Sequence, residues 1–154
     1  MRIRTRTRTR TRTLSAVALL ALSAPLTTVS AQEPVTYVNG RSASQADAPP
    51  FSGGVMVGNT LYLSGVLGGT ATTTAEEAAR AALNSMRSTL EAAGMTMDDL
   101  VQVQIFASDL ADYQAFNAVY RTYFTREFPT RAFLGAGSLL NGAKFEVLGI
   151  AARR

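Results

Sequence analysis

Apolar residues between residue 55 and the C-terminus follow two periods, a period of two in short runs and a helical period in longer ones. Residues 55–57 and 61–63 alternate on either side of Gly58-Asn59, which is typical of a β-hairpin with a tight turn. Residues 100–107 are alternating and rich in β-branched side chains, which predicts a central strand. Two further apolar runs, around residues 131 and 146, predict the last two strands.

Two segments with helical spacing separate these strands. The first follows Thr74, which forms a Ser/Thr-x-x-Glu capping box with Glu77, and it stops at Gly94. The second starts at Asp112, its expected N-cap residue. The element order is then β-β-α-β-α-β-β, which indicates an α+β domain. The apolar stripes consist of Ala79, Ala82, Leu83, Met86, Leu90 and Ala93 in the first helix, and of Phe116, Val119, Tyr120, Tyr123 and Phe124 in the second.

Two helices can cover only one face of the predicted mixed sheet, yet the strands are apolar on both sides. In residues 100–106 and 145–150, apolar side chains occupy both alternating sets of positions. An apolar sheet face must be buried against something. Self-association is the simplest solution, so we expect an oligomer.

The last quarter of the chain carries two charges inside strand-like apolar runs, Arg131 and Glu146, with Asn141-Gly142 between the runs. If the two runs pair as a hairpin, a guanidinium and a carboxylate lie in the same region of one sheet. Burying a charged side chain in a sheet costs free energy unless the charge is paired or takes part in binding or catalysis. A guanidinium is also well suited to bind a planar carboxylate through two parallel hydrogen bonds.

The N-terminus has the pattern of a secretory signal peptide, predicted at residues 1–31 with cleavage after Ala31. Six arginines precede an apolar run at residues 14–24 that is too short to span a bilayer comfortably, and small residues follow at 29–31. We therefore expect a periplasmic or secreted protein that is not membrane-bound after cleavage. A mitochondrial transit peptide and a misplaced start codon are the alternatives. Residues 32–48, rich in Ser, Ala and Pro, predict a flexible arm, and residues 49–154 the folded domain.

Charge and composition exclude several function classes. The chain of 154 residues has a net charge of +4, but six of its fifteen basic residues lie in residues 1–31. The remaining nine face eleven acidic residues, a net charge of about −2, which removes the support for nucleic-acid binding. The chain has no Cys and no His. Ser-His-Asp and Cys-His catalysis and the usual zinc sites are thus excluded.

Five short motifs in register resemble the Rid/YjgF family of reactive-intermediate deaminases and together span roughly residues 49–152. For that family, the resemblance implies a chorismate-mutase-like homotrimer with three active-site clefts between subunits. It also implies hydrolysis of a small 2-imino acid, such as 2-iminopropionate or 2-iminobutyrate, without metal or organic cofactor. The motifs are PFSGGV at 50–55, GNTLYLSG at 58–65, EAAG with MDDLV at 91–101, DYQAFNAVY at 112–120, and PTRAF at 129–133 with a later FEV at 145–147.

The resemblance assigns the catalytic roles to Arg131 and Glu146. Arg131 matches the arginine that binds the substrate carboxylate, and Glu146 matches a glutamate that holds water near the imine carbon. Their ordinary structural alternatives are a surface arginine at a strand start and a charge on an edge strand. A non-catalytic binder of a small carboxylate is the main alternative function, and a ribonuclease fits poorly with the acidic domain and the missing histidine.

Five more residues are expected to form the substrate-binding cleft by the same resemblance. Ser64 and Gly65 end a strand beside it, although the Ser64 hydroxyl alternatively bonds only to backbone. Asn117, an amide in an apolar helix stripe, more readily braces the site than touches the substrate. Phe51 stands where the family often has tyrosine, and Phe133 occupies a position that is often small. These departures leave the substrate's identity open.

Overall fold

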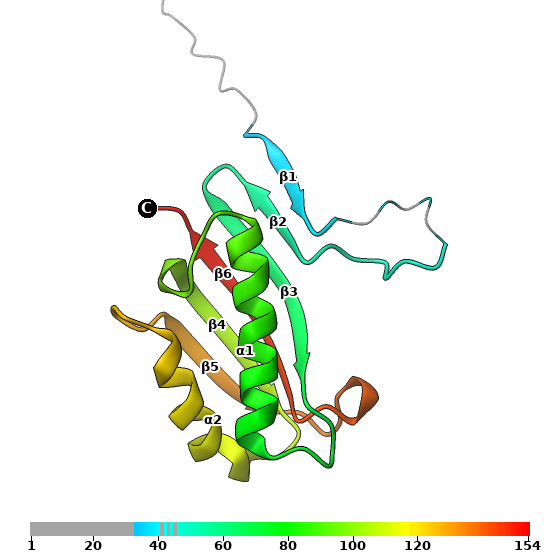
Figure 1. The fold of residues 1–154 in the computed structure, drawn as a ribbon, viewed down its shortest axis with the longest axis vertical. Helices are drawn as coiled ribbons and strands as arrows, with labels where there is room; N and C mark the ends of the chain where they lie inside the picture. Colours follow the sequence, from blue (N-terminus) through cyan, green and yellow to red (C-terminus); the bar gives the residue numbers. More distant parts are fainter. Residues whose placement is uncertain (1–32, 41, 43, 45) are drawn as a thin grey trace, which may run out of the picture. The chain divides into compact units, whose positions relative to one another are not determined.

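A six-stranded mixed sheet forms the framework of the protein, with strand order β1-β2-β3-β6-β4-β5 (Figure 1). Neighbouring strands are antiparallel except β4 and β5, which are parallel. The computed structural model describes residues 33–40, 42, 44 and 46–154, so the predicted signal peptide lies outside the described residues. The strands are β1 Val35–Val38, β2 Gly54–Val57, β3 Thr60–Gly68, β4 Leu100–Ala107, β5 Thr130–Gly135 and β6 Phe145–Ala152.

Two helices, α1 Ala75–Ala92 and α2 Tyr113–Tyr120, pack side by side on one face of this sheet, as predicted (Figure 1). Short 3-10 turns occur at Met97–Asp99, Leu110–Asp112, Arg121–Tyr123 and Leu140–Gly142. Within the described residues, no helix has the length and apolar character needed to cross a bilayer.

The start and end of α1 follow from local sequence. The Thr74 hydroxyl accepts a hydrogen bond from the Glu77 amide at 3.2 Å, and the Glu77 carboxylate accepts one from the Thr74 amide at 3.0 Å. This reciprocal pair is the predicted capping box. At the other end, Gly94 has φ of +68°, the left-handed conformation that glycine adopts at low cost. The prediction for α2 is less accurate, because the Asp112 carboxylate makes no capping bond and instead pairs with Lys144 at 3.3 Å.

The expectation that residues 32–48 form a flexible arm is wrong for Val35–Val38. This run, VTYV, forms β1 and pairs antiparallel with β2, with Tyr37 opposite Val55. Its β-branched and aromatic side chains suit an extended strand, and β2 offers a free edge. The sheet therefore has one more strand than predicted, and this strand precedes the predicted hairpin in the chain. Strand β3 is also longer than predicted, because it continues through an irregularity between Leu63 and Val66 as far as Gly68.

The predicted pairing of the last two strands is also wrong. Strand β4 lies between β5 and β6, so the segments that carry Arg131 and Glu146 are not neighbours. The turn at Asn141-Gly142 exists, with φ of 58° and 67°. It connects the outer strand β5 to β6, which lies on the other side of β4. Strands β5 and β4 run parallel, and their register places Arg131 beside Val103.

The hydrophobic core fills the space between the sheet and the two helices. Alternate residues of the central strands point into it, including Val103, Ile105, Phe145 and Val147, all fully buried. The residues between them face the other side of the sheet. That side is largely apolar, and within the described part of the chain no helix covers it (Figure 1). Its residues are partly buried or exposed and include Tyr62, Phe106, Leu134, Leu148 and Ile150.

Candidate ligand-binding site around Arg131

Arg131 lies on the edge strand β5 and points toward α2 on the helix-covered side of the sheet. Its Nη1 donates a hydrogen bond of 2.7 Å to Oδ1 of Asn117, and its Nη2 donates one of 3.3 Å to the Tyr113 hydroxyl. Asn117 is buried, so its amide oxygen orients the guanidinium from a fixed position. Sequence reasoning assigned Asn117 a bracing role, and its contact with Arg131 is of that kind.

The spacing of residues on α2 explains why these partners converge. Tyr113, Asn117 and Tyr120 are separated by four and three residues, so they lie along one side of the helix. The Arg131 Cζ atom lies 5.6 Å from the centre of the Tyr113 ring and 5.0 Å from that of Tyr120. Both distances are within the range of cation–π attraction. The guanidinium is thus fixed by two hydrogen bonds and two aromatic faces.

No carboxylate among the described residues compensates the charge of Arg131. The ion pairs found in this part of the chain are Arg87–Glu91 and Lys144–Asp112. A partly buried cation without an acidic partner is free to bind an anion, and a bidentate carboxylate matches its geometry.

A cavity of about 220 Å³ opens beside the guanidinium. Three of the seven lining residues are aromatic, and none of the described residues that line it is acidic. The lining residues are Tyr113, Asn117, Tyr120, Arg121, Phe128, Pro129 and Arg131. Of these, only Asn117 and Arg131 were candidates from the sequence. The helical spacing from Tyr113 to Tyr120 was the available signal for the two tyrosines.

The Tyr120 hydroxyl is buried and has no hydrogen-bond partner among the described residues. Burial raises the pKa of this phenol to about 12, and the nearby charge of Arg131 opposes that rise only in part. The phenol is therefore neutral at physiological pH. Its ring packs against Phe124 and Phe128 and provides an uncharged wall for the cavity.

Asp98 holds the loop that carries the outer wall of the cavity. Its carboxylate accepts hydrogen bonds from the amide of Thr125 at 2.9 Å, from the Thr125 hydroxyl, and from the amide of Arg126 at 3.3 Å. These hydrogen bonds, led by the one from the Thr125 hydroxyl, lower the pKa of Asp98. The loop continues to Phe128 and Pro129, so Asp98 supports the cavity from outside it.

Glu146 lies on the opposite face of the sheet from Arg131. In the ladder it pairs with Phe106, whereas Arg131 pairs with Val103, which points to the helices. The Glu146 carboxylate lies over Gly65, where a Cβ atom would collide with its Oε1. The structure thus brings Glu146 to Gly65 but not to Arg131, contrary to the expectation that one sheet region holds both charges.

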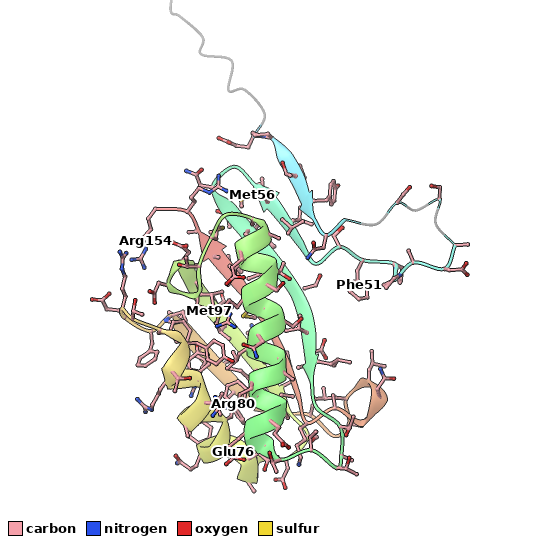
Figure 2. The ribbon with its side chains drawn as sticks, in the orientation of Figure 1. Phe51, Met56, Glu76, Arg80, Met97 and Arg154 are labelled. Atoms are coloured by element: carbon pink, nitrogen blue, oxygen red, sulfur yellow. The ribbon has the colours of Figure 1, made fainter. Side chains whose placement is uncertain are left out.

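Phe51 and Ser64 line a second cavity, of about 620 Å³, beside the loop that leads into β2. Figure 2 shows Phe51 on this loop, on the other side of α1 from α2. The Ser64 hydroxyl donates a 2.7 Å hydrogen bond to the Ser52 carbonyl, the backbone role left open by the sequence. Phe133 packs edge-on against Tyr113, with 5.0 Å between ring centres, and joins the core rather than the Arg131 cavity. The expected cleft residues therefore fall into separate groups within one chain.

The described residues contain no cluster of three or more His, Cys, Asp or Glu side chains positioned to hold a metal ion. The groups that surround the Arg131 cavity are cationic, aromatic and amide side chains. Such a set recognises a small organic anion by charge, hydrogen bonding and ring contact.

Comparison with known proteins identifies the family. The family described as Endoribonuclease L-PSP, also called YjgF/Rid, matches residues 42–153, and the chain belongs to this family. A 2-iminobutanoate/2-iminopropanoate deaminase of Dermatophagoides farinae is 36% identical over 104 residues, covering 64% of this chain and 81% of that protein. The human protein of the same name is 33% identical over 122 residues, 72% of this chain and 88% of the relative.

The fold comparison agrees with this assignment. The crystal structure of the YjgF gene product from E. coli matches with a TM-score of 0.64 and 32% identity, covering 68% of this chain and 89% of that one. The predicted resemblance to the Rid/YjgF family and the predicted α+β fold are therefore confirmed.

Proposed function

We propose that this protein hydrolyses 2-imino acids to 2-keto acids and ammonia, with the substrate carboxylate bound by Arg131. The observation that carries the proposal is the Arg131 guanidinium, which has no acidic partner among the described residues and is fixed by Asn117 and Tyr113 at the wall of a small cavity. Relatives that are 33–36% identical and named 2-iminobutanoate/2-iminopropanoate deaminase support the same reaction class.

The reaction needs only water as co-reactant. A water oxygen adds to the imine carbon, and its proton passes to the nitrogen to give a carbinolamine. The proton of the carbinolamine hydroxyl then passes to the amine nitrogen, the C–N bond breaks, and ammonia leaves as the carbonyl forms. Such imines also hydrolyse without a catalyst, so positioning the substrate and stabilising the developing charge are sufficient contributions from a protein.

Glu146 is the proposed group that orients the water and accepts its proton. Because Glu146 and Arg131 face opposite sides of the sheet within one chain, we propose that they meet across an interface between two copies. The uncovered apolar side of the sheet, which carries Phe106, Leu148 and Ile150 around Glu146, supports burial of this surface. A homotrimer with three inter-subunit sites is the assembly that we propose.

A complementation experiment tests the shared site. Arg131→Ala and Glu146→Gln each remove one half of a site, so each homotrimer should lose most of its activity. Co-refolded mixtures should regain activity, up to about a quarter of the wild-type sites if subunits mix at random. Mixtures that stay inactive although native mass spectrometry shows trimers containing both variants would contradict a shared site. A stable monomer at micromolar concentration would contradict the assembly itself.

We also propose that residues 1–31 direct export, so that the protein acts outside the cytosol. The imine would then be supplied there by oxidases or dehydrogenases that act on amino acids. The support is the sequence pattern of basic, apolar and small residues described above.

A non-catalytic carboxylate-binding protein is the second candidate. The observation that favours it is the absence of an acidic side chain among the described residues that line the Arg131 cavity, which leaves that cavity without a base in the single chain. Ammonia release from freshly generated 2-iminobutyrate separates the two functions. Release faster than in buffer supports the deaminase, and binding of 2-oxobutyrate without such release supports the binder.

A further inference from the structure

A second arginine, Arg121, lines the same cavity as Arg131. It follows the last residue of α2, is exposed, and its Cζ atom lies 5.8 Å from the centre of the Phe128 ring. The ion pairs formed by the described residues do not include Arg121. Its guanidinium is therefore also available to an anion.

Two stacked rings connect the two guanidinium groups. Arg131 lies 5.0 Å from the Tyr120 ring, and Tyr120 lies 6.2 Å from Phe128 with an angle of 24° between the rings. Phe128 in turn contacts Arg121. The cavity thus has an aromatic wall with one cation at each end.

This concentration of positive charge is unusual for the chain. Residues 32–154 contain nine basic and eleven acidic residues, yet two of the nine basic residues line one cavity of about 220 Å³. A ligand with one carboxylate would occupy only Arg131 and leave Arg121 without an anionic partner. A ligand with two carboxylates would compensate both.

A structural explanation of Arg121 also exists. A cation at the C-terminal end of a helix interacts favourably with the helix dipole. That role accounts for the charge at this end of α2 but requires neither the ring contact nor the position in the cavity wall. The two explanations differ in their consequences for ligand choice, because only a binding role makes Arg121 distinguish between ligands.

We propose that the preferred substrates are 2-imino dicarboxylic acids, such as 2-iminosuccinate or 2-iminoglutarate. Arg131 binds the carboxylate next to the imine, and Arg121 binds the distal carboxylate. This inference rests on the proposed deaminase function for its reaction. The cavity is smaller than the ~300–1,000 Å³ typical of pockets for drug-sized ligands, which suits a compact metabolite.

The chemistry of such a substrate also places the protein in a reaction sequence. The imine would come from two-electron oxidation of a dicarboxylic amino acid by an oxidase or dehydrogenase. Its hydrolysis yields ammonia and a 2-keto dicarboxylic acid.

Binding of stable keto acids tests the inference without relying on turnover. By calorimetry, the wild-type protein should bind 2-oxoglutarate or oxaloacetate about tenfold more tightly than 2-oxobutyrate, because one more charge-assisted hydrogen bond forms. Arg121→Gln should abolish this preference. Arg126→Gln is the matched control, since it removes an equal charge from the same loop region but does not line the cavity, and it should retain the preference.

Equal affinity of the wild-type protein for 2-oxobutyrate and both dicarboxylates would overturn the inference. Equal loss of preference in Arg121→Gln and Arg126→Gln would also overturn the inference. It would show that the preference depends on the positive charge of the region and not on Arg121 in the cavity wall. Imine hydrolysis separates this inference from the proposed function. If 2-iminobutyrate is hydrolysed but no dicarboxylate preference exists, the second anchor is wrong and the deaminase stands. If no imine is hydrolysed but Arg121-dependent binding persists, the anchor stands and the deaminase is wrong.

Discussion

Replacement of Tyr120 by phenylalanine removes a single oxygen atom from the wall of the Arg131 cavity and keeps the ring. The hydroxyl is buried without a hydrogen-bond partner in the described part of the chain, and Tyr120 is 3% exposed. Leaving a buried polar group unsatisfied costs about 1–3 kcal/mol. At neutral pH, Tyr120→Phe should therefore be as stable as the wild type or more stable, by up to this amount.

The pH dependence of this difference gives a sharper test. The folded-state pKa of Tyr120 is about 12, raised by burial above the ordinary tyrosine value of 10.0. A group with a raised pKa contributes its full stability below the unfolded pKa and loses it as pH rises toward the folded pKa. With these values, the wild-type protein should lose roughly 1.4 kcal/mol of unfolding free energy between pH 8 and pH 11 through this group alone.

Urea unfolding of both proteins at pH 8, 9, 10 and 11 measures the effect. The stability advantage of Tyr120→Phe should grow by about the same amount over that range. Tyr37→Phe is the matched control, because it removes the same oxygen atom from a side chain that is 64% exposed. A constant difference between Tyr120→Phe and wild type would refute the buried, unpartnered hydroxyl.

Three other predictions concern the supports of the cavity and the maturation of the chain. Asn117→Leu should weaken binding of 2-oxobutyrate about tenfold by calorimetry, because the guanidinium loses its 2.7 Å hydrogen bond; unchanged affinity would show that Asn117 does not orient Arg131. The pKa of Asp98 is lowered, so its contribution to stability is present above its unfolded pKa and is lost as pH falls through its folded pKa. Thermal unfolding should show Asp98→Asn to be less stable than wild type at pH 6 and the two to converge toward pH 3, and a pH-independent gap would contradict this role. Mass spectrometry of the protein from its native host should find an N-terminus at Gln32, whereas an intact chain in the cytosol would contradict export.

The elements of the fold were predictable where local chemistry determines them. The capping box at Thr74 and the left-handed Gly94 define α1 through contacts within a few residues. The alternation in residues 100–107 likewise identified β4 with its observed bounds. Strand partners are a different matter, because the apolar pattern of a strand does not specify its neighbour. Sequence proximity favoured pairing β5 with β6, whereas the fold inserts β4 between them.

The candidate site was predictable only in part for the same reason. Alternation places Glu146 on the opposite side of its strand from Phe145 and Val147. Only the strand order and register reveal that Arg131 faces the same side of the sheet as Phe145 and Val147, which is the helix-covered side. Arg121 was missed because an exposed arginine after a helix has the pattern of any solvated charge. Its relevance depends on the contact with Phe128, which follows from the path of the loop.

The anchor role of Arg131 is the central claim, and one comparison tests it most directly. Ammonia release from freshly generated 2-iminobutyrate should be measured for the wild type, Arg131→Ala and the control Arg126→Ala, with circular dichroism and light scattering to verify fold and assembly. A hydrogen-bonded charge contact is worth about 1.5–3 kcal/mol, so Arg131→Ala should lower kcat/KM at least about tenfold. Arg126→Ala should retain wild-type turnover. Acceleration by the wild type that Arg131→Ala matches would show that the arginine is structural and would contradict the proposed mechanism.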